Sequence, residues 1–114
     1  MTTIEYAFTD TNFALRASGH TGFAENGKDI VCAAISALLS TISISAENLE
    51  QYSAIKVFRN KLDIGFCHFN FYIIDLRVAK CLFTPYISAL KSIAKQYPKN
   101  VTVNQVDIHQ LSYY

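Results

Sequence analysis

The sequence predicts an α+β domain in which two main helices cover one mostly antiparallel sheet. With 114 residues, 51% of them hydrophobic and 17% charged, the chain is long enough for one substantial core and too apolar to be disordered. Short segments rich in β-branched and aromatic residues come in pairs, and a longer segment with helical spacing follows each pair. These observations predict the order β-β-α-β-β-α-β in a single domain spanning residues 1–114.

The first pair of strands is predicted at residues 2–8 and 13–18. Both segments have the composition of strands, and the second alternates regularly. The turn residues Asp10, Thr11 and Asn12 lie between them, which predicts a hairpin. A polar loop with two glycines follows at residues 21–28.

The first helix is predicted to begin after Asp29, a favourable N-cap residue. Residues 30–39 are apolar on nearly every face, so we expect this helix to be sandwiched, with contacts on more than one side. Polar residues return over 43–51 and indicate exposed last turns. The apolar run 30–44 has fifteen residues, which is too short to cross a bilayer and predicts a buried helix.

The second half predicts two strands at residues 52–59 and 64–73, joined by a turn at 60–63. The sequence leaves two alternatives for the residue at which the second helix begins. Apolar spacing from Leu76 onward fits a helix that would kink at Pro85, whereas Thr84 followed by Pro85 is typical of an N-cap and a first helical residue. The segment Pro98-Lys99-Asn100 ends the helix, and residues 101–108 alternate as a closing strand.

The charge and the cysteines limit the functional classes. Ten Lys and Arg against nine Asp and Glu give a net charge of +1 without a basic patch, so nucleic acid is not a favoured ligand. The low surface charge predicts that a partner or a second copy covers part of the apolar surface. The N-terminus lacks the pattern of a signal peptide. Three cysteines without CxxC spacing indicate neither a disulfide framework nor a zinc site, so we expect a cytoplasmic protein without a metal or other cofactor.

Cys32 and His20 are the candidate catalytic residues. Cys32 falls in the predicted first turn of the helix, where unpaired backbone N–H groups and the helix dipole stabilise an anion. His20 follows the second strand between glycines and could fold back over the helix start. A thiolate and an imidazole are the minimal pair that attacks a carbonyl and then protonates a leaving amine. The alternative is that Cys32 is an inert, buried small hydrophobe.

Two further residues have supporting roles in this hypothesis. Asp29 is interpreted first as the helix cap, and orienting His20 as the third member of a triad is the alternative. Ser36 lies on the same helix face as Cys32 and could bond near the thiolate, although a serine more commonly bonds the carbonyl four residues earlier. Backbone N–H groups around Cys32 are the expected oxyanion hole.

The remaining histidines and cysteines are assigned no chemistry. His68 and His109 are predicted to be surface residues, and Cys67 is predicted to be part of the core. Cys81 lies in the ambiguous start of the second helix and receives no role.

The segment GHTGFAENGKDIVCAAISALL resembles the signature of the ribosomal-processing cysteine protease family, Prp. That signature is a Gly-His pair, a glycine-bearing loop, and then Gly-x-Asp-Ile-Val-Cys-Ala-x-x-Ser. The matching residues are Gly19, His20, Gly27, Asp29, Ile30, Val31, Cys32, Ala33 and Ser36. Farther on, LKSIAKQYPKNVTV resembles the family's last helix, its Tyr-Pro stop and its final strand.

The resemblance implies a small dimeric cysteine protease that removes an N-terminal extension from the twenty-seventh protein of the large ribosomal subunit. It implies that Cys32 is the nucleophile and His20 the general base and acid, with Asp29 and Ser36 in support. The loop with Thr21, Gly22 and Gly27 would cover the bound peptide. The family's substrate has aromatic residues before the cut, which suits an apolar cleft.

The sequence departs from the family at two positions. Thr21 stands where the family usually has Ala, and Pro85 falls inside a segment that the family makes helical, so the resemblance favours a helix from Leu76. Two other functional classes fit the sequence less well. A non-catalytic, ribosome-associated binding module would have no need for both His20 and Cys32, and a metal-binding domain would need more clustered ligands.

Overall fold

The computed structural model describes residues 1–25 and 27–111; Asn26, in the predicted loop, and residues 112–114 lie outside the described residues. The elements are β1 (Thr2–Phe8), β2 (Asn12–Ser18), α1 (Ile30–Gln51), β3 (Ile55–Asp63), β4 (Phe66–Ile73), α2 (Leu76–Gln96), β5 (Val101–Gln105) and a short 3-10 helix (Ile108–Gln110). This order of main strands and helices confirms the predicted α+β fold.

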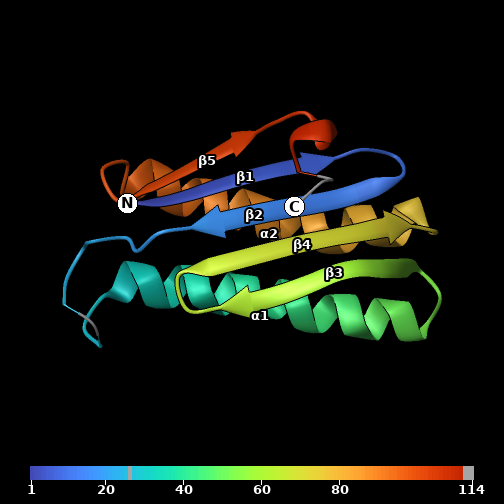
Figure 1. The fold of residues 1–114 in the computed structure, drawn as a ribbon, viewed down its shortest axis with the longest axis horizontal. Helices are drawn as coiled ribbons and strands as arrows, with labels where there is room; N and C mark the ends of the chain where they lie inside the picture. The colour runs from blue at the N-terminus through green and yellow to red at the C-terminus, as the bar shows by residue number, and fades with distance from the viewer. Residues whose placement is uncertain (26, 112–114) are drawn as a thin grey trace.

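The strands form one mixed sheet in the order β3-β4-β2-β1-β5. Only β1 and β5 run parallel; the other described pairs are antiparallel. Both helices lie against the same face of the sheet, as Figure 1 shows, and the main core fills the space between the two layers. Phe83 of α2 stacks there on Phe13 and Phe71, with ring centroids 4.4 and 5.7 Å away.

The helix α2 begins at Leu76, so the alternative start at Thr84 is wrong. Asp75 caps the helix by accepting a hydrogen bond from the Val78 N–H at 3.4 Å, and Pro85 lies inside the helix. Proline removes one helical hydrogen bond. The turns before it nevertheless remain helical because Ala79 and Phe83 are buried against the sheet, which offsets that loss.

The predicted turn at residues 60–63 is also wrong, because β3 continues to Asp63. The Asn60 side chain, instead of stabilising a turn, accepts a hydrogen bond from the Ser43 hydroxyl of α1 at 2.7 Å and donates one to the Ser43 carbonyl at 3.1 Å. The chain turns instead at Ile64 and Gly65, where the φ of +75° at Gly65 is one that glycine adopts readily. The closing strand is shorter than predicted, since β5 ends at Gln105.

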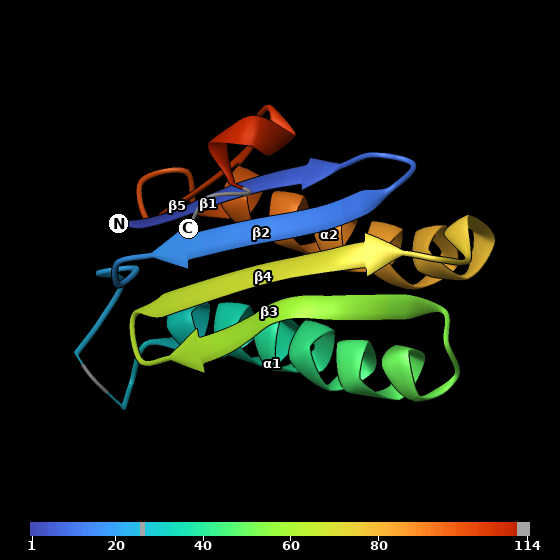
Figure 2. The ribbon, with the colours of Figure 1, turned by 45° about the vertical axis from the view of Figure 1, so that its right-hand side comes forward.

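The helix α1 is buried along one face, through Val31, Ile35, Leu39, Ile42 and Ala46. It contacts β3 and α2, and Figure 2 shows it running along the β3 side of the sheet. The residues Ala33, Ala34, Ala37, Thr41 and Ile44 are exposed on its other side. Within one chain, the helix α1 is therefore not covered on all the sides that the sequence predicts to be in contact.

The length argument against a membrane-spanning segment does not hold for α1 as a whole. With 22 residues, α1 is long and apolar enough to cross a bilayer by length and composition. Core helices meet the same criterion, and one face of α1 packs in the core.

On the opposite face of the sheet, the C-terminal segment covers His68. Leu111 packs with Ala7 and Ala14 in a second small core, and the Leu111 carbonyl lies 3.2 Å from Nε2 of His68. His68 is 1% exposed, so its prediction as a surface residue is wrong. His109 is exposed and Cys67 is buried, as predicted, and Cys81 is exposed on α2.

Candidate active site

Asp29 caps α1 as predicted and fixes the position of Cys32. One oxygen of the carboxylate, Oδ1, accepts a hydrogen bond from the Cys32 N–H at 2.8 Å. This bond places the half-buried Cys32 thiol in the first turn of the helix. It also engages the Cys32 N–H, which is therefore not free to act in the expected oxyanion hole.

The other oxygen of Asp29, Oδ2, organises the loop that follows His20. It accepts hydrogen bonds from the Thr21 hydroxyl and from the N–H groups of Phe23, at 3.1 Å, and Ala24, at 3.4 Å. Burial alone raises the pKa of the Asp29 carboxyl, but these bonds and that from Cys32 outweigh it, so the pKa lies below 3.8. No described hydrogen bond joins Asp29 to His20, so the structure gives Asp29 the role of a cap.

The backbone on either side of His20 is anchored. The Gly19 N–H donates to the Gly65 carbonyl at 3.0 Å, and the Thr2 hydroxyl donates to the Gly19 carbonyl at 3.2 Å. The Thr21 carbonyl accepts a hydrogen bond from the Asn100 side chain at 2.9 Å. Gly19 has a φ of +89°, and a Cβ there would overlap the Met1 carbonyl oxygen, so only glycine fits.

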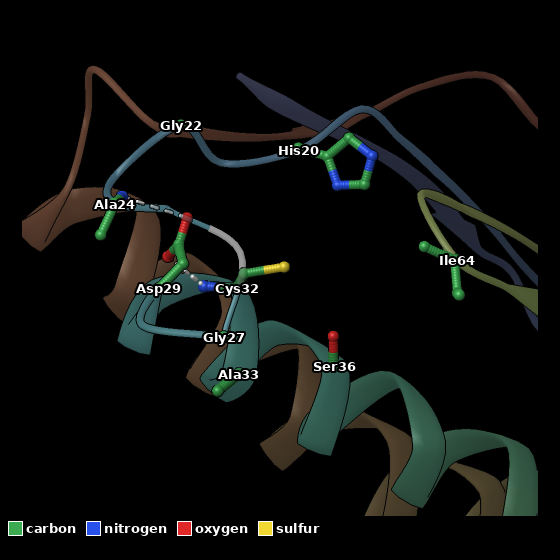
Figure 3. Close-up of a pocket in the computed structure, with 9 residues that line it drawn as sticks. All are labelled: His20, Gly22, Ala24, Gly27, Asp29, Cys32, Ala33, Ser36 and Ile64. Carbon is green, nitrogen blue, oxygen red and sulfur yellow. Dashed lines mark hydrogen bonds between the residues drawn. The ribbon is translucent and has the colours of Figure 1, made fainter.

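The His20 imidazole is exposed and lies against the β3–β4 turn. A Cβ placed on Gly65 would be 3.1 Å from Nε2 of His20. Figure 3 shows the imidazole, the Cys32 thiol and the Ser36 hydroxyl facing a shared space, with Ile64 on its far side. The thiol and the imidazole form no hydrogen bond with each other in the described part of the chain.

Ser36 lies one turn after Cys32, and its hydroxyl is directed into this space (Figure 3). The commoner alternative, a bond to the carbonyl four residues earlier, is not found among the described hydrogen bonds. The Ser36 hydroxyl is thus available to a molecule bound between Cys32 and His20.

Two adjoining cavities meet at the thiol. A cavity of about 500 Å³ lies under the loop and is lined by Gly22, Gly27 and Asp29 among others. A second, of about 570 Å³, lies between α1 and the β3–β4 turn. The residues common to both are His20, Cys32, Ser36 and Ile64. Cavities of this size suit small ligands or short peptide segments.

The wall of the second cavity is largely apolar. Its apolar side chains include Ile35 and Leu39 from α1 and Leu62, Ile64 and Phe66 around the β3–β4 turn. Ile64 is 96% exposed and, with Leu62 and Phe66, which are each 38% exposed, leaves apolar surface open on this wall. The arrangement places a thiol, an imidazole and a hydroxyl in a cleft that extends past them on both sides.

The predicted loop residues do not share one environment. Thr21 is buried at 1% exposure, whereas Gly22 and Gly27 are exposed and line the first cavity. Phe23 packs edge-on against Tyr97 at the end of α2, with ring centroids 5.4 Å apart. Thr21 is therefore the anchored end of the loop.

Sequence reasoning missed Ile64, Gly65 and Asn100. Gly65 inside an apparent strand was the available signal for the turn, since an isolated glycine there often marks a break. No sequence signal connects Asn100 with Thr21. Within the described residues, no group of three or more His, Cys, Asp or Glu side chains is placed to hold a metal ion.

Comparisons with known proteins agree on one family. Residues 1–102 match the family model of the cysteine protease Prp. The essential ribosomal processing protease Prp from S. aureus, with a covalently linked product peptide, is 25% identical over 93% of this chain and 100% of that one, with a TM-score of 0.68. The same protease with a substrate peptide is 26% identical over the same shares, with a TM-score of 0.64.

A Streptococcus mutans protein of 23% identity has the same fold, with a TM-score of 0.62 over 93% of this chain and 94% of that one. No curated protein matches the chain.

Proposed function

Because this chain belongs to the Prp family of cysteine proteases, we propose that it removes the N-terminal extension from the precursor of the twenty-seventh protein of the large ribosomal subunit. The chain is a cysteine protease, and ribosomal processing is the function of the S. aureus relative that was solved with peptides. The observation that carries the proposal is that Cys32, in α1, and His20, in the loop after β2, line one open cleft.

In the proposed mechanism, His20 takes the proton of the Cys32 thiol, and Sγ attacks the carbonyl carbon of the scissile peptide bond. The tetrahedral intermediate collapses as the C–N bond breaks, and His20 protonates the leaving amine. A thioester to Cys32 remains. His20 then deprotonates a water molecule that attacks this thioester, which releases the new carboxylate and restores the thiol.

Ser36 is proposed to support this chemistry by donating its hydroxyl to the oxyanion of the intermediate. Two observations support the role: the hydroxyl faces the space beside Cys32, and the Cys32 N–H is already bonded to Asp29. Removing one such donor typically lowers kcat about 10²- to 10³-fold. Ser36→Ala is therefore expected to lower kcat strongly.

The two cavities are proposed to bind the peptide on either side of the cut. The apolar wall of Leu62, Ile64 and Phe66 suits the aromatic residues that the family resemblance implies before the cut. The exposed part of the loop, with Gly22 and Gly27, is proposed to cover the peptide once it is bound.

The proposal is tested by incubating the protein and its Cys32→Ala variant with the extended precursor and following the precursor's mass. The wild-type protein should shorten the precursor at one site, and Cys32→Ala should bind it without cutting. A wild-type protein that binds the precursor and leaves it intact would favour the alternative, a non-catalytic binding module.

We further propose that the enzyme acts in the cytoplasm as a homodimer. The support for a second copy is the exposed, mostly apolar outer side of α1, which includes Ala33, Ala37 and Ile44. Light scattering should give twice the chain mass for the wild-type protein and a lower mass for Ile44→Glu. A monomeric wild-type protein would overturn the homodimer.

A further inference from the structure

We infer that Thr21 and Asn100 are positioning residues that set the place of His20 relative to Cys32. The inference rests on the proposed function, because it assigns them to the reaction of that pair. The His20 side chain is exposed and makes no hydrogen bond in the described part of the chain. The location of its imidazole therefore depends on how the backbone beside it is held.

Thr21 links the base to the nucleophile through a single carboxylate. Its hydroxyl donates to Oδ2 of Asp29, while Oδ1 of Asp29 accepts the Cys32 N–H at 2.8 Å. His20 is thus joined to Cys32 by one peptide bond and two hydrogen bonds. Thr21 is also 1% exposed, so its place between the loop and the core is closely defined.

Asn100 braces the residues on both sides of His20. Its side-chain amide donates to the Thr21 carbonyl at 2.9 Å, which fixes the following residue directly. Its own carbonyl accepts the Thr2 N–H at 2.9 Å, and the Thr2 hydroxyl in turn holds the Gly19 carbonyl at 3.2 Å. Asn100 is itself held by its N–H, which donates to Tyr97 at the end of α2 at 2.9 Å.

The consequence for catalysis follows from the geometry that proton transfer requires. A misplacement of about 1 Å at a reacting group can lower a rate about 10²-fold. Asn100 does not line the cleft, and Thr21 lines the second cavity but is only 1% exposed and so offers a bound peptide little surface. Their loss should therefore affect the chemical step more than peptide binding.

The test compares kcat and KM of Thr21→Val, Thr21→Ser and Asn100→Ala on the extended precursor peptide. Valine keeps the shape of threonine without the hydroxyl. Thr21→Val and Asn100→Ala should each lower kcat about tenfold and change KM less than about twofold. Thr21→Ser, which keeps the hydroxyl, should restore kcat to within about threefold of the wild type. The double variant should lose less than the product of the two losses, because both residues act on one segment.

The matched control is Ser43→Ala, which removes a hydroxyl bond of 2.7 Å to Asn60 away from the cleft. It should lower the melting temperature and leave kcat unchanged. The inference is overturned if Thr21→Val keeps the wild-type kcat, if it raises KM alone, or if Thr21→Ser fails to restore activity.

A second readout does not depend on proteolysis, and so separates this inference from the proposed function. If the wild-type protein cuts nothing, the proposed function fails, and the pH profile of Cys32 alkylation by iodoacetamide decides the positioning role. Thr21→Val should move the midpoint of that profile toward the midpoint of His20→Ala. A Thr21→Val profile equal to that of the wild type, or a His20→Ala variant without effect, overturns the inference.

Discussion

Replacing Ile64 by serine tests whether the β3–β4 turn binds substrate. Because Ile64 is 96% exposed in the free protein, Ile64→Ser should change the free energy of unfolding by less than about 0.5 kcal/mol. Full burial of an isoleucine side chain contributes about 1.5–3 kcal/mol. If a bound peptide covers half of Ile64, the variant loses about 0.8–1.5 kcal/mol of binding, which corresponds to a drop in kcat/KM of about 4- to 12-fold.

The assay measures kcat/KM with two precursor peptides, one with aromatic residues before the cut and one with alanines there. For Ile64→Ser, kcat/KM should fall by about 4- to 12-fold on the aromatic peptide. On the alanine peptide it should fall by less than about twofold, because the small side chains leave Ile64 exposed. The control is Ile74→Ser, which removes another exposed isoleucine, 58% exposed, just beyond the opposite end of β4. Equal losses on both peptides, or no loss on either, would refute the reasoning.

Three further predictions concern stability. Gly19→Ala should lower the free energy of unfolding measured in urea by more than about 1 kcal/mol, because φ is +89° and the new Cβ would overlap Met1. Phe83→Ala should lower it by about 3–5 kcal/mol in the same assay, since Phe83 is fully buried, whereas the exposed Tyr52→Ala should have little effect. For His68, burial lowers the pKa below 6.5, so the unfolded chain takes up the proton first as the pH falls. The stability that neutral His68 contributes above pH 6.5 should therefore decline as the pH falls from 6.5 toward the lower folded-state pKa, and urea unfolding at several pH values should show a smaller decline for His68→Gln.

The features that could be predicted from the sequence are those set by near neighbours. Asp29 and Cys32 are three residues apart, so the cap and the place of the thiol follow from helix geometry alone. The hairpin of β1 and β2 follows in the same way from alternation and from the turn between the strands.

The features that were missed are set by partners far along the chain. Asn60 belongs to a strand because it pairs with Phe69 of β4, and its side chain bonds Ser43, 17 positions earlier. His68 is buried because Leu111, 43 positions later, lies over it. The bond from Asn100 to Thr21 spans 79 positions. Local propensity does not predict such contacts, because they form only when the sheet and helices pack together.

The partners of the buried His68 also show which of its ring nitrogens carries the hydrogen. The Arg59 guanidinium, 3.3 Å from Nδ1, can only donate, so Nδ1 accepts and Nε2 carries the hydrogen that it donates to the Leu111 carbonyl. In the neutral form of His68, both ring nitrogens are therefore hydrogen-bonded. His68, which the sequence predicts to be a surface residue without a chemical role, instead holds Leu111 against the sheet.

The cap formed by Asp29, which was predicted correctly, also occupies the Cys32 N–H, one of the donors expected in the oxyanion hole. A backbone N–H donates one strong hydrogen bond at a time, and that of Cys32 already donates to Asp29 at 2.8 Å. Transferring it to an oxyanion would remove the cap, which contributes about 1 kcal/mol and holds the thiol in the first turn. A donor that is free before substrate arrives needs no such exchange, and the Ser36 hydroxyl is one. The helix start therefore holds the Cys32 thiol in place, and we propose that the Ser36 hydroxyl in the next turn donates to the developing negative charge.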